Sequence, residues 1–120
     1  MAATSGTLHD LLRPSHARDN VEAWRWAVRR QLVPVRDRLL HERSHHRHEA
    51  WLSARASRTL RERDSLLTRL NRLAAQVMVT HDVESVRSEL SRLLADIDRH
   101  SQRMSDLAYD EVELEIGGSE

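Results

Sequence analysis

Residues 83–107, VESVRSELSRLLADIDRHSQRMSDL, carry the strongest helical pattern of this chain. The apolar residues of this stretch recur at alternating steps of three and four, and one histidine, His100, takes a place in the same series. This rhythm predicts an amphipathic helix of about 25 residues with one continuous buried stripe. Asp82, directly before the stretch, is a suitable N-cap. The stripe consists of Val83, Val86, Leu90, Leu93, Ile97, His100, Met104 and Leu107.

An earlier segment, residues 21–39, has the same helical spacing. Asp19 or Asn20 can cap it, because either side chain can accept a hydrogen bond from the first turn. Pro34 lies inside this segment and lacks the amide that would bond to the preceding turn, so the helix either bends there or splits in two. The apolar positions are Val21, Trp24, Val28, Leu32, Val35 and Leu39.

A third helical segment is expected between Glu49 and Thr80. Its apolar positions keep helical spacing over almost the whole segment, which is typical of a long helix with one buried face. The stripe consists of Leu52, Ala56, Leu60, Leu67, Leu70, Ala74 and Val77, with Arg63 in one of its positions.

These segments predict an all-α protein, an up-and-down antiparallel bundle of three long helices, or of four if the first divides at Pro34. The bundle domain is expected at residues 20–110, after a partly ordered N-terminal arm at residues 1–19 and before an acidic C-terminal tail at residues 111–120. The heptad stripe could serve the chain's own core or a second copy, so a homodimer that completes the bundle is also expected.

The composition excludes several classes of chemistry. The 120 residues contain 19 basic and 19 acidic side chains, every basic one being arginine, and no cysteine. Lysine Schiff bases, thiolate nucleophiles, disulfides and cysteine-based metal sites are therefore excluded. The N-terminus lacks the pattern of a signal peptide, and no segment is apolar enough to span a membrane, so a cytoplasmic protein without membrane contact is expected.

Residues 111–116, Glu-Val-Glu-Leu-Glu-Ile, alternate acidic and apolar side chains. A period of two is typical of a strand, in which Val112, Leu114 and Ile116 would share one face. Such a strand could add to the sheet edge of a protein partner. The other interpretation is a frayed helix end whose acids are solvated or fold against the arginines.

Residues 41–45, His-Glu-Arg-Ser-His, match the H-E-x-x-H pattern of zinc hydrolases. The charged Arg43 and the solvated, histidine-rich surroundings argue against a catalytic zinc site of this kind. His41, His45 and Glu49 also recur every four residues, and such a row on one helix face could bind a divalent ion. A solvated polar connection is the simpler interpretation of this segment.

His100 interrupts an apolar heptad and therefore needs hydrogen-bond partners inside the bundle. Arg63 lies on the stripe of the preceding helix, and we expect a polar core layer that joins His100 with Arg63, Asp64 or Asp96 and sets the helix register. Metal or small-ligand binding is the alternative role for His100.

The first helix also carries a candidate nucleic-acid surface. Arg25, Arg29, Arg36 and Arg43 can line one side of it beside Trp26, and arginines with an aromatic residue suit phosphate contact and base stacking. Acidic residues interleave throughout the chain and no DNA-binding motif is present, which argues against nucleic acid as the partner.

The layout resembles the hemerythrin-like, or HHE cation-binding, helical bundles over about residues 20–110. The similar parts are Leu32-Val33-Pro34 ahead of a helix, LRERDSLL at residues 60–67, RHSQR at residues 99–103, and Tyr109 after them. The resemblance implies a four-helix bundle that holds two irons through histidine and carboxylate ligands.

Residue by residue, the resemblance implies that His45 and Glu49 match the ligands of the second family helix and that His100 matches the histidine of the fourth. The chain departs from the pattern in the third helix, where Arg61 and Ser65 replace histidines. It departs again in the fourth helix, where Ser105 replaces the last carboxylate, and only His9 or His16 could supply the first-helix ligand.

The sequence therefore favours a small non-catalytic interaction or scaffold protein without cofactors, which self-associates and binds a protein partner through residues 111–120. The alternative is a degenerate hemerythrin-like bundle that binds iron, zinc or another divalent ion through His41, His45, Glu49 or His100.

Overall fold

The structure, a computed structural model, describes residues 8–13, 20–42 and 50–118, and for residues 50–56 and 107–118 it describes the backbone alone. Three long helices dominate: α2 (Val21–Leu40), α3 (Ala50–Val79) and α4 (Val83–Gly118). A short helical segment at residues 8–11 precedes them.

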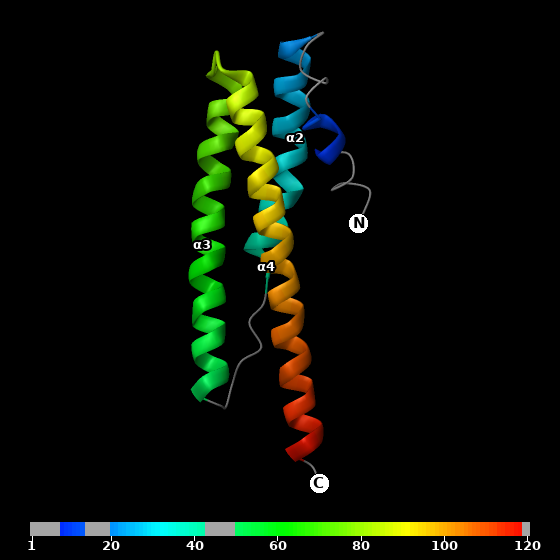
Figure 1. The fold of residues 1–120 in the computed structure, drawn as a ribbon, viewed down its shortest axis with the longest axis vertical. Helices are drawn as coiled ribbons and strands as arrows, with labels where there is room; N and C mark the ends of the chain where they lie inside the picture. Colours follow the sequence, from blue (N-terminus) through cyan, green and yellow to red (C-terminus); the bar gives the residue numbers. More distant parts are fainter. Residues whose placement is uncertain (1–7, 14–19, 43–49, 119–120) are drawn as a thin grey trace.

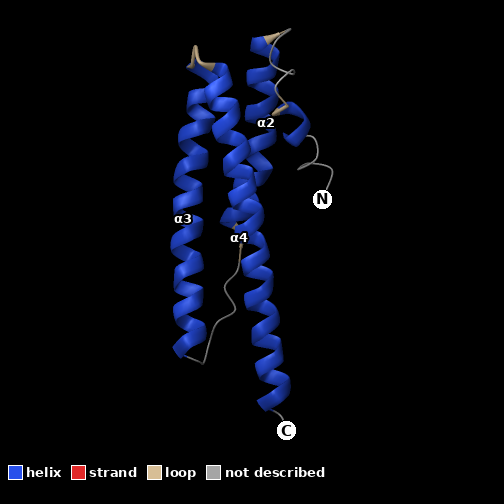
Figure 2. Cartoon of the chain, viewed as in Figure 1, coloured by secondary structure: helices blue, strands red, loops and turns tan. Residues whose placement is uncertain are grey.

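The three long helices run side by side along an elongated molecule of 62 × 24 × 18 Å. Helices α2 and α4 run in the same direction, and α3 runs opposite to both (Figure 1). Every element of the described residues is a helix, and none is a strand (Figure 2). The predicted all-α, up-and-down antiparallel bundle is confirmed.

Pro34 does not divide the first long helix. Helix α2 continues through it from Val21 to Leu40, so the bundle has three long helices rather than four. Pro34 leaves the carbonyl of Arg30 without its helical partner, and Arg30 is an exposed residue. Because water can bond to a carbonyl on the outer side of a helix, the missing hydrogen bond does not end α2.

Side-chain caps begin two of the helices as predicted. Asn20 accepts a hydrogen bond through Oδ1 from the backbone amide of Ala23, at 3.0 Å, at the start of α2. Asp82 accepts one from the amide of Ser85, at 3.1 Å, at the start of α4. Each cap satisfies one of the amides that a helix N-terminus leaves without a helical partner.

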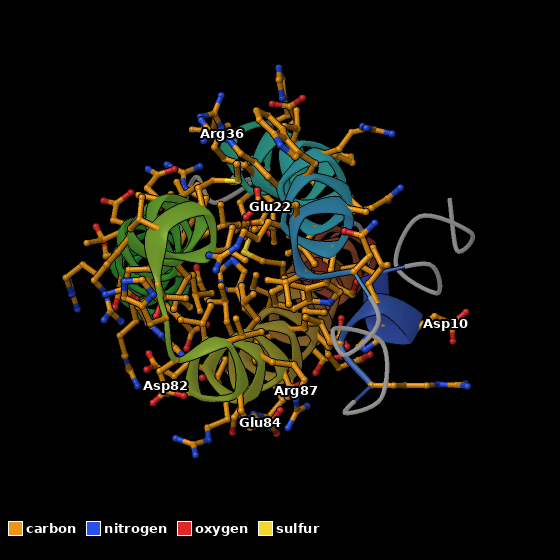
Figure 3. All side chains as sticks on the ribbon, turned by 90° about the horizontal axis from the view of Figure 1, so that it is seen from above. Asp10, Glu22, Arg36, Asp82, Glu84 and Arg87 are labelled. Carbon is orange, nitrogen blue, oxygen red and sulfur yellow. The ribbon has the colours of Figure 1, made fainter. Side chains whose placement is uncertain are left out.

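The core is aliphatic, with Trp24 as its only buried aromatic residue among the described residues. The stripes predicted for α2 and α4 are largely confirmed, whereas in α3 Leu66 and Leu73 are buried and the predicted Leu67 and Ala74 lie at the edge of the core. Side chains of the three long helices meet around one axis, with charged groups on the outside (Figure 3). The buried apolar residues are Leu8, Leu12, Trp24, Val28, Leu32, Val35, Leu39, Leu66, Leu70, Leu73, Val77, Val86, Leu90, Leu93, Leu94 and Ile97.

The described part of the N-terminal arm packs onto the bundle. Leu8 and Leu12 are buried in the core. The indole Nε1 of Trp24 donates to the carbonyl of Leu11 at 2.7 Å, and Arg87 Nη1 donates to the carbonyl of Leu12 at 2.8 Å. These two donors satisfy carbonyls at the end of the short helix, where no following turn can bond to them.

Of the two interpretations of residues 111–116, the strand is wrong and the helical end is found, because α4 continues as a helix to Gly118. Glutamate and leucine are good helix formers, and a helix that is already formed extends at low cost. A helical turn of 3.6 residues puts positions 112 and 116 on one side of α4 and position 114 on the other. The proposed common face of Val112, Leu114 and Ile116 therefore does not exist in this conformation.

The three long helices differ in length, and this leaves one end of the molecule with two helices. Helix α2 has 20 residues, α3 has 30 and α4 has 36. At 1.5 Å per residue these correspond to about 30, 45 and 54 Å. The beginning of α3 and the end of α4 extend beyond the last turn of α2 (Figure 1). We call this part, residues 50–61 and 106–118, the two-helix end.

None of the helices in the described residues combines the length and apolar character that crossing a membrane requires.

Candidate functional site: a histidine between two carboxylates

His100 of α4 is fully buried, with 0% of its surface exposed, and is the centre of a polar layer in the core. Its Nδ1 lies 2.6 Å from Oε1 of Glu62 on α3, and its Nε2 lies 2.6 Å from Oε2 of Glu42, which follows α2. The layer therefore joins all three long helices through one imidazole ring. The predicted polar core layer around His100 exists, with partners other than those expected.

The two contacts of His100 set a condition on the donors in the layer. A neutral imidazole has one N–H donor and one acceptor nitrogen, and an ionised carboxylate can only accept. Both contacts are therefore hydrogen bonds only if the ring is an imidazolium, or if the ring is neutral and one glutamate is protonated.

Glu62 is held from its other side by an arginine of α4. Arg103 donates from Nε to Oε1 of Glu62 at 3.1 Å and from Nη2 to Oε2 at 2.5 Å. Burial of Glu62 works to raise the pKa of its carboxyl, but the hydrogen bonds and charges of Arg103 and His100 together lower that pKa below its ordinary value. Glu62 is therefore an ionised bridge between a buried ring and a surface cation.

None of the three predicted partners contacts His100 directly: Asp64 and Asp96 lie outside the layer, and Arg63 contacts it only through a backbone carbonyl. Arg63 reaches the layer through the backbone, since its Nη1 donates to the carbonyl of Glu42 at 3.3 Å. Asp64 lies 3.9 Å from Arg63 Nε at the surface. Asp96 belongs to a separate network. The sequence identified the histidine, but helix spacing could not show that Glu42, at the end of α2, turns toward it.

Asp96 is the centre of that second network, between α3 and α4. Arg69 of α3 donates to its Oδ2 at 2.7 Å, and Arg99 pairs with its Oδ1. The hydrogen bond from Arg69 lowers the pKa of Asp96, more than burial raises it. Asp96 and Glu62 thus form two cross-helix ion pairs that lie about two turns apart.

The residues predicted to hold a metal do not form a site in the described part of the chain. His45 and Glu49 lie outside the described residues. The Nδ1 of His41 is within 2.7 Å of the backbone carbonyl of Asp37, and its side chain is exposed. Both nitrogens of His100 already face carboxylates. No group of three or more potential metal-binding side chains occurs among the described residues.

Arg25, one of the arginines that could line a nucleic-acid surface on the first helix, is buried instead. It is only 8% exposed. Its guanidinium donates from Nη1 to the carbonyl of Val77 at 2.8 Å and from Nη2 to the carbonyl of Thr80 at 2.7 Å. It therefore caps the end of α3, where unpaired carbonyls and the helix dipole favour a cation. Arg43, another member of that predicted surface, lies outside the described residues.

The outer side of α2 carries an unusual apolar row. Trp26 is 56% exposed, Val33 50% and Leu40 52%, and steps of seven residues place them on one side of the helix. Arg29, Arg30 and Arg36 lie on the same side and are exposed, and none of them pairs with an acid of the described residues. We call these six residues the outer α2 face.

A groove of about 550 Å³ between α3 and α4 is lined by charged and hydroxyl side chains. Three of its arginines already have acidic partners: Arg69 pairs with Asp96, Arg72 with Glu89 at 3.8 Å, and Arg87 with Glu84 at 2.5 Å. Its cations are therefore largely neutralised within the bundle.

The fold and these clusters define a class: an all-α antiparallel bundle whose buried polar groups bond its own helices together. Comparison of the chain with known protein families, with curated proteins and with solved structures finds no match.

Proposed function

We propose that the protein is a non-catalytic, self-associating interaction module that binds through the acidic end of α4, including residues 111–120. The observation that carries this proposal is the two-helix end. A helix with an apolar stripe must bury it against another element, and two helices cover less of each other's apolar surface than the three helices of the rest of the bundle do. Among the described residues, the part beyond α2 has no third helix, and a partner can supply one.

The charges of the two-helix end favour a specific protein partner. Residues 106–118 of α4 contain Asp106, Asp110, Glu111, Glu113 and Glu115 and no basic residue. Residues 50–61 of α3 contain three arginines and no acid. Such an end suits a partner that carries both apolar and basic groups, because charge complementarity steers association and excludes wrong partners.

The polar clusters inside the bundle support a structural role rather than catalysis. His100, Glu42 and Glu62 bond to one another across the helices, and Arg25 bonds to backbone carbonyls. Groups that are engaged in this way stabilise one packing arrangement, as buried polar layers do in helical bundles.

Light scattering on the full chain and on a chain that ends at Asp110 tests the proposal. We expect the full chain at twice its 13.9 kDa mass and the shortened chain at the single mass, with the same melting temperature for the bundle. A full chain that stays at the single mass over all accessible concentrations would overturn self-association. An unchanged dimer after truncation would show that the end of α4 is not needed for it.

A further inference from the structure

We infer that two copies of the chain form a closed antiparallel dimer, in which the acidic end of α4 of each copy packs on the outer α2 face of the other. This inference rests on the proposed self-association and names the surface that receives the end of α4. Four independent features of the chain support it: the apolar row of α2, its unpaired arginines, the acidity of α4 and the lengths of the two segments.

The outer α2 face has the chemistry of a helix-docking surface. Trp26, Val33 and Leu40 are each at least half exposed, whereas the apolar residues of the core are buried. A row of apolar side chains at a spacing of seven is the pattern that packs against another helix. In the described residues, nothing covers this row.

The charge around the row selects an acidic occupant. Arg29, Arg30 and Arg36 lie beside the row, and the acids on this side are Asp37 and Glu22, of which Glu22 lies 3.5 Å from Arg25. Elsewhere on the bundle, exposed arginines such as Arg99 and Arg103 pair with carboxylates of the same chain. A helix that brings carboxylates between apolar residues would pair these cations while it covers the row.

The chain itself contains a helix with that chemistry. Residues 106–118 of α4 hold five acids, no base, and apolar residues between the acids. They span about 18 Å at 1.5 Å per residue, and the row from Trp26 to Leu40 spans about 21 Å. The two segments therefore match in length as well as in charge.

The end of α4 cannot reach the outer α2 face of its own chain. Helix α4 is continuous from Val83 to Gly118 and leads away from α2 along the long axis of the molecule (Figure 1). The contact must therefore form between two copies.

A two-fold axis perpendicular to the bundle makes both contacts at once. It inverts the second copy, so that the end of its α4 lies antiparallel to α2 of the first copy, and the reverse contact is identical. Each α2 then supplies the third helix that the two-helix end of the other copy lacks. The arrangement closes at two copies, because the outer α2 face and the acidic end of α4 of each copy are then covered by the other copy.

Two sets of charge reversals test this arrangement. The first variant carries Arg29→Glu, Arg30→Glu and Arg36→Glu, and the second carries Glu111→Arg, Glu113→Arg and Glu115→Arg. Each variant alone places like charges across the interface, so we expect the molar mass of each to fall from the dimer to the monomer. Mixed together, the two variants have opposite charges at both contacts, so the dimer mass should return.

Arg38→Glu is the matched control, because Arg38 is an exposed arginine of α2 that lies about 140° around the helix from Val33. It should leave the dimer intact. Circular dichroism reports whether each variant is folded, and if the triple α2 variant unfolds, Val33→Glu tests the same face with one substitution.

Four outcomes would overturn the inference. A dimer that survives reversal of the α2 arginines means that the copies associate through another surface, and the proposed self-association then still stands. A mixture of variants that stays monomeric excludes the reciprocal contact. A series of species larger than the dimer means an open head-to-tail chain. A monomeric wild type would overturn the inference together with the proposed function.

Discussion

His100 on α4 and Glu42, which directly follows the last turn of α2 and His41, lie 2.6 Å apart although 58 residues separate them in the chain. The same ring contacts Glu62 on α3, so one side chain links three helices at one level of the core. This relationship makes His100 a structural element whose loss should be measurable.

Replacing His100 with leucine should destabilise the protein. Leucine fills the space, but the carboxylate of Glu42 then lies beside an apolar surface and has lost its hydrogen-bond donor. We expect this loss to lower the free energy of unfolding by about 1–3 kcal/mol. Chemical denaturation at pH 7 measures this difference. The control is His41→Leu, since His41 is exposed and its loss should change the stability by less than about 0.5 kcal/mol. Equal stability of the His100 variant and the wild type would contradict the role of the layer.

Stability should decrease in acid because of Glu62 and Asp96. The pKa of each carboxyl is lowered in the folded protein, Glu62 by Arg103 and His100 against the effect of burial, and Asp96 mainly by Arg69. A group with a lowered folded pKa contributes its stabilisation above the unfolded pKa and loses it as the pH falls through the folded pKa. We therefore expect the loss to begin below about pH 5 and to continue downward.

Denaturation of the wild type and of Glu62→Gln at several pH values separates this contribution. The variant should have a lower free energy of unfolding than the wild type at pH 7. Between pH 5 and pH 3 its free energy of unfolding should fall less steeply than that of the wild type. Parallel curves for the two proteins would mean that Glu62 does not contribute to the acid dependence.

Arg25→Ala should loosen the junction of α3 and α4. The substitution removes both donors from the carbonyls of Val77 and Thr80, at a cost of about 2–3 kcal/mol for partly buried bonds to a charged group. Hydrogen exchange should become faster at the start of α4 and the end of α3. Arg38→Ala is the control, because Arg38 is an exposed arginine of the same helix outside the outer α2 face, and similar exchange in both variants would argue against a capping role.

Trp24→Phe should release the N-terminal segment while keeping the core filled. It removes the indole donor to the carbonyl of Leu11 and leaves an aromatic ring in place. We expect a loss of about 1 kcal/mol and faster proteolysis within residues 8–13. Proteolysis at the wild-type rate would show that burial of Leu8 and Leu12 is sufficient to hold this segment.

The helices could be predicted from the sequence because their signals are local. The three-four spacing from Val83 to Met104 and the caps at Asn20 and Asp82 depend on residues within a few turns of one another. The terminal strand was predicted wrongly for the same reason: the alternation at residues 111–116 is local, but the helix it continues is longer and extends through it.

What the sequence determined by itself was the all-α class, the helix starts and the presence of a polar residue in the core at His100. Packing of the helices against one another pairs His100 with Glu42 and Glu62 and brings Arg25 to the end of α3. It also leaves Trp26, Val33 and Leu40 outside the core. Helical periodicity tells which residues share a side of one helix. The rotation and height of each helix against its neighbours depend on contacts between residues far apart in the chain, and these appear only when the helices pack together.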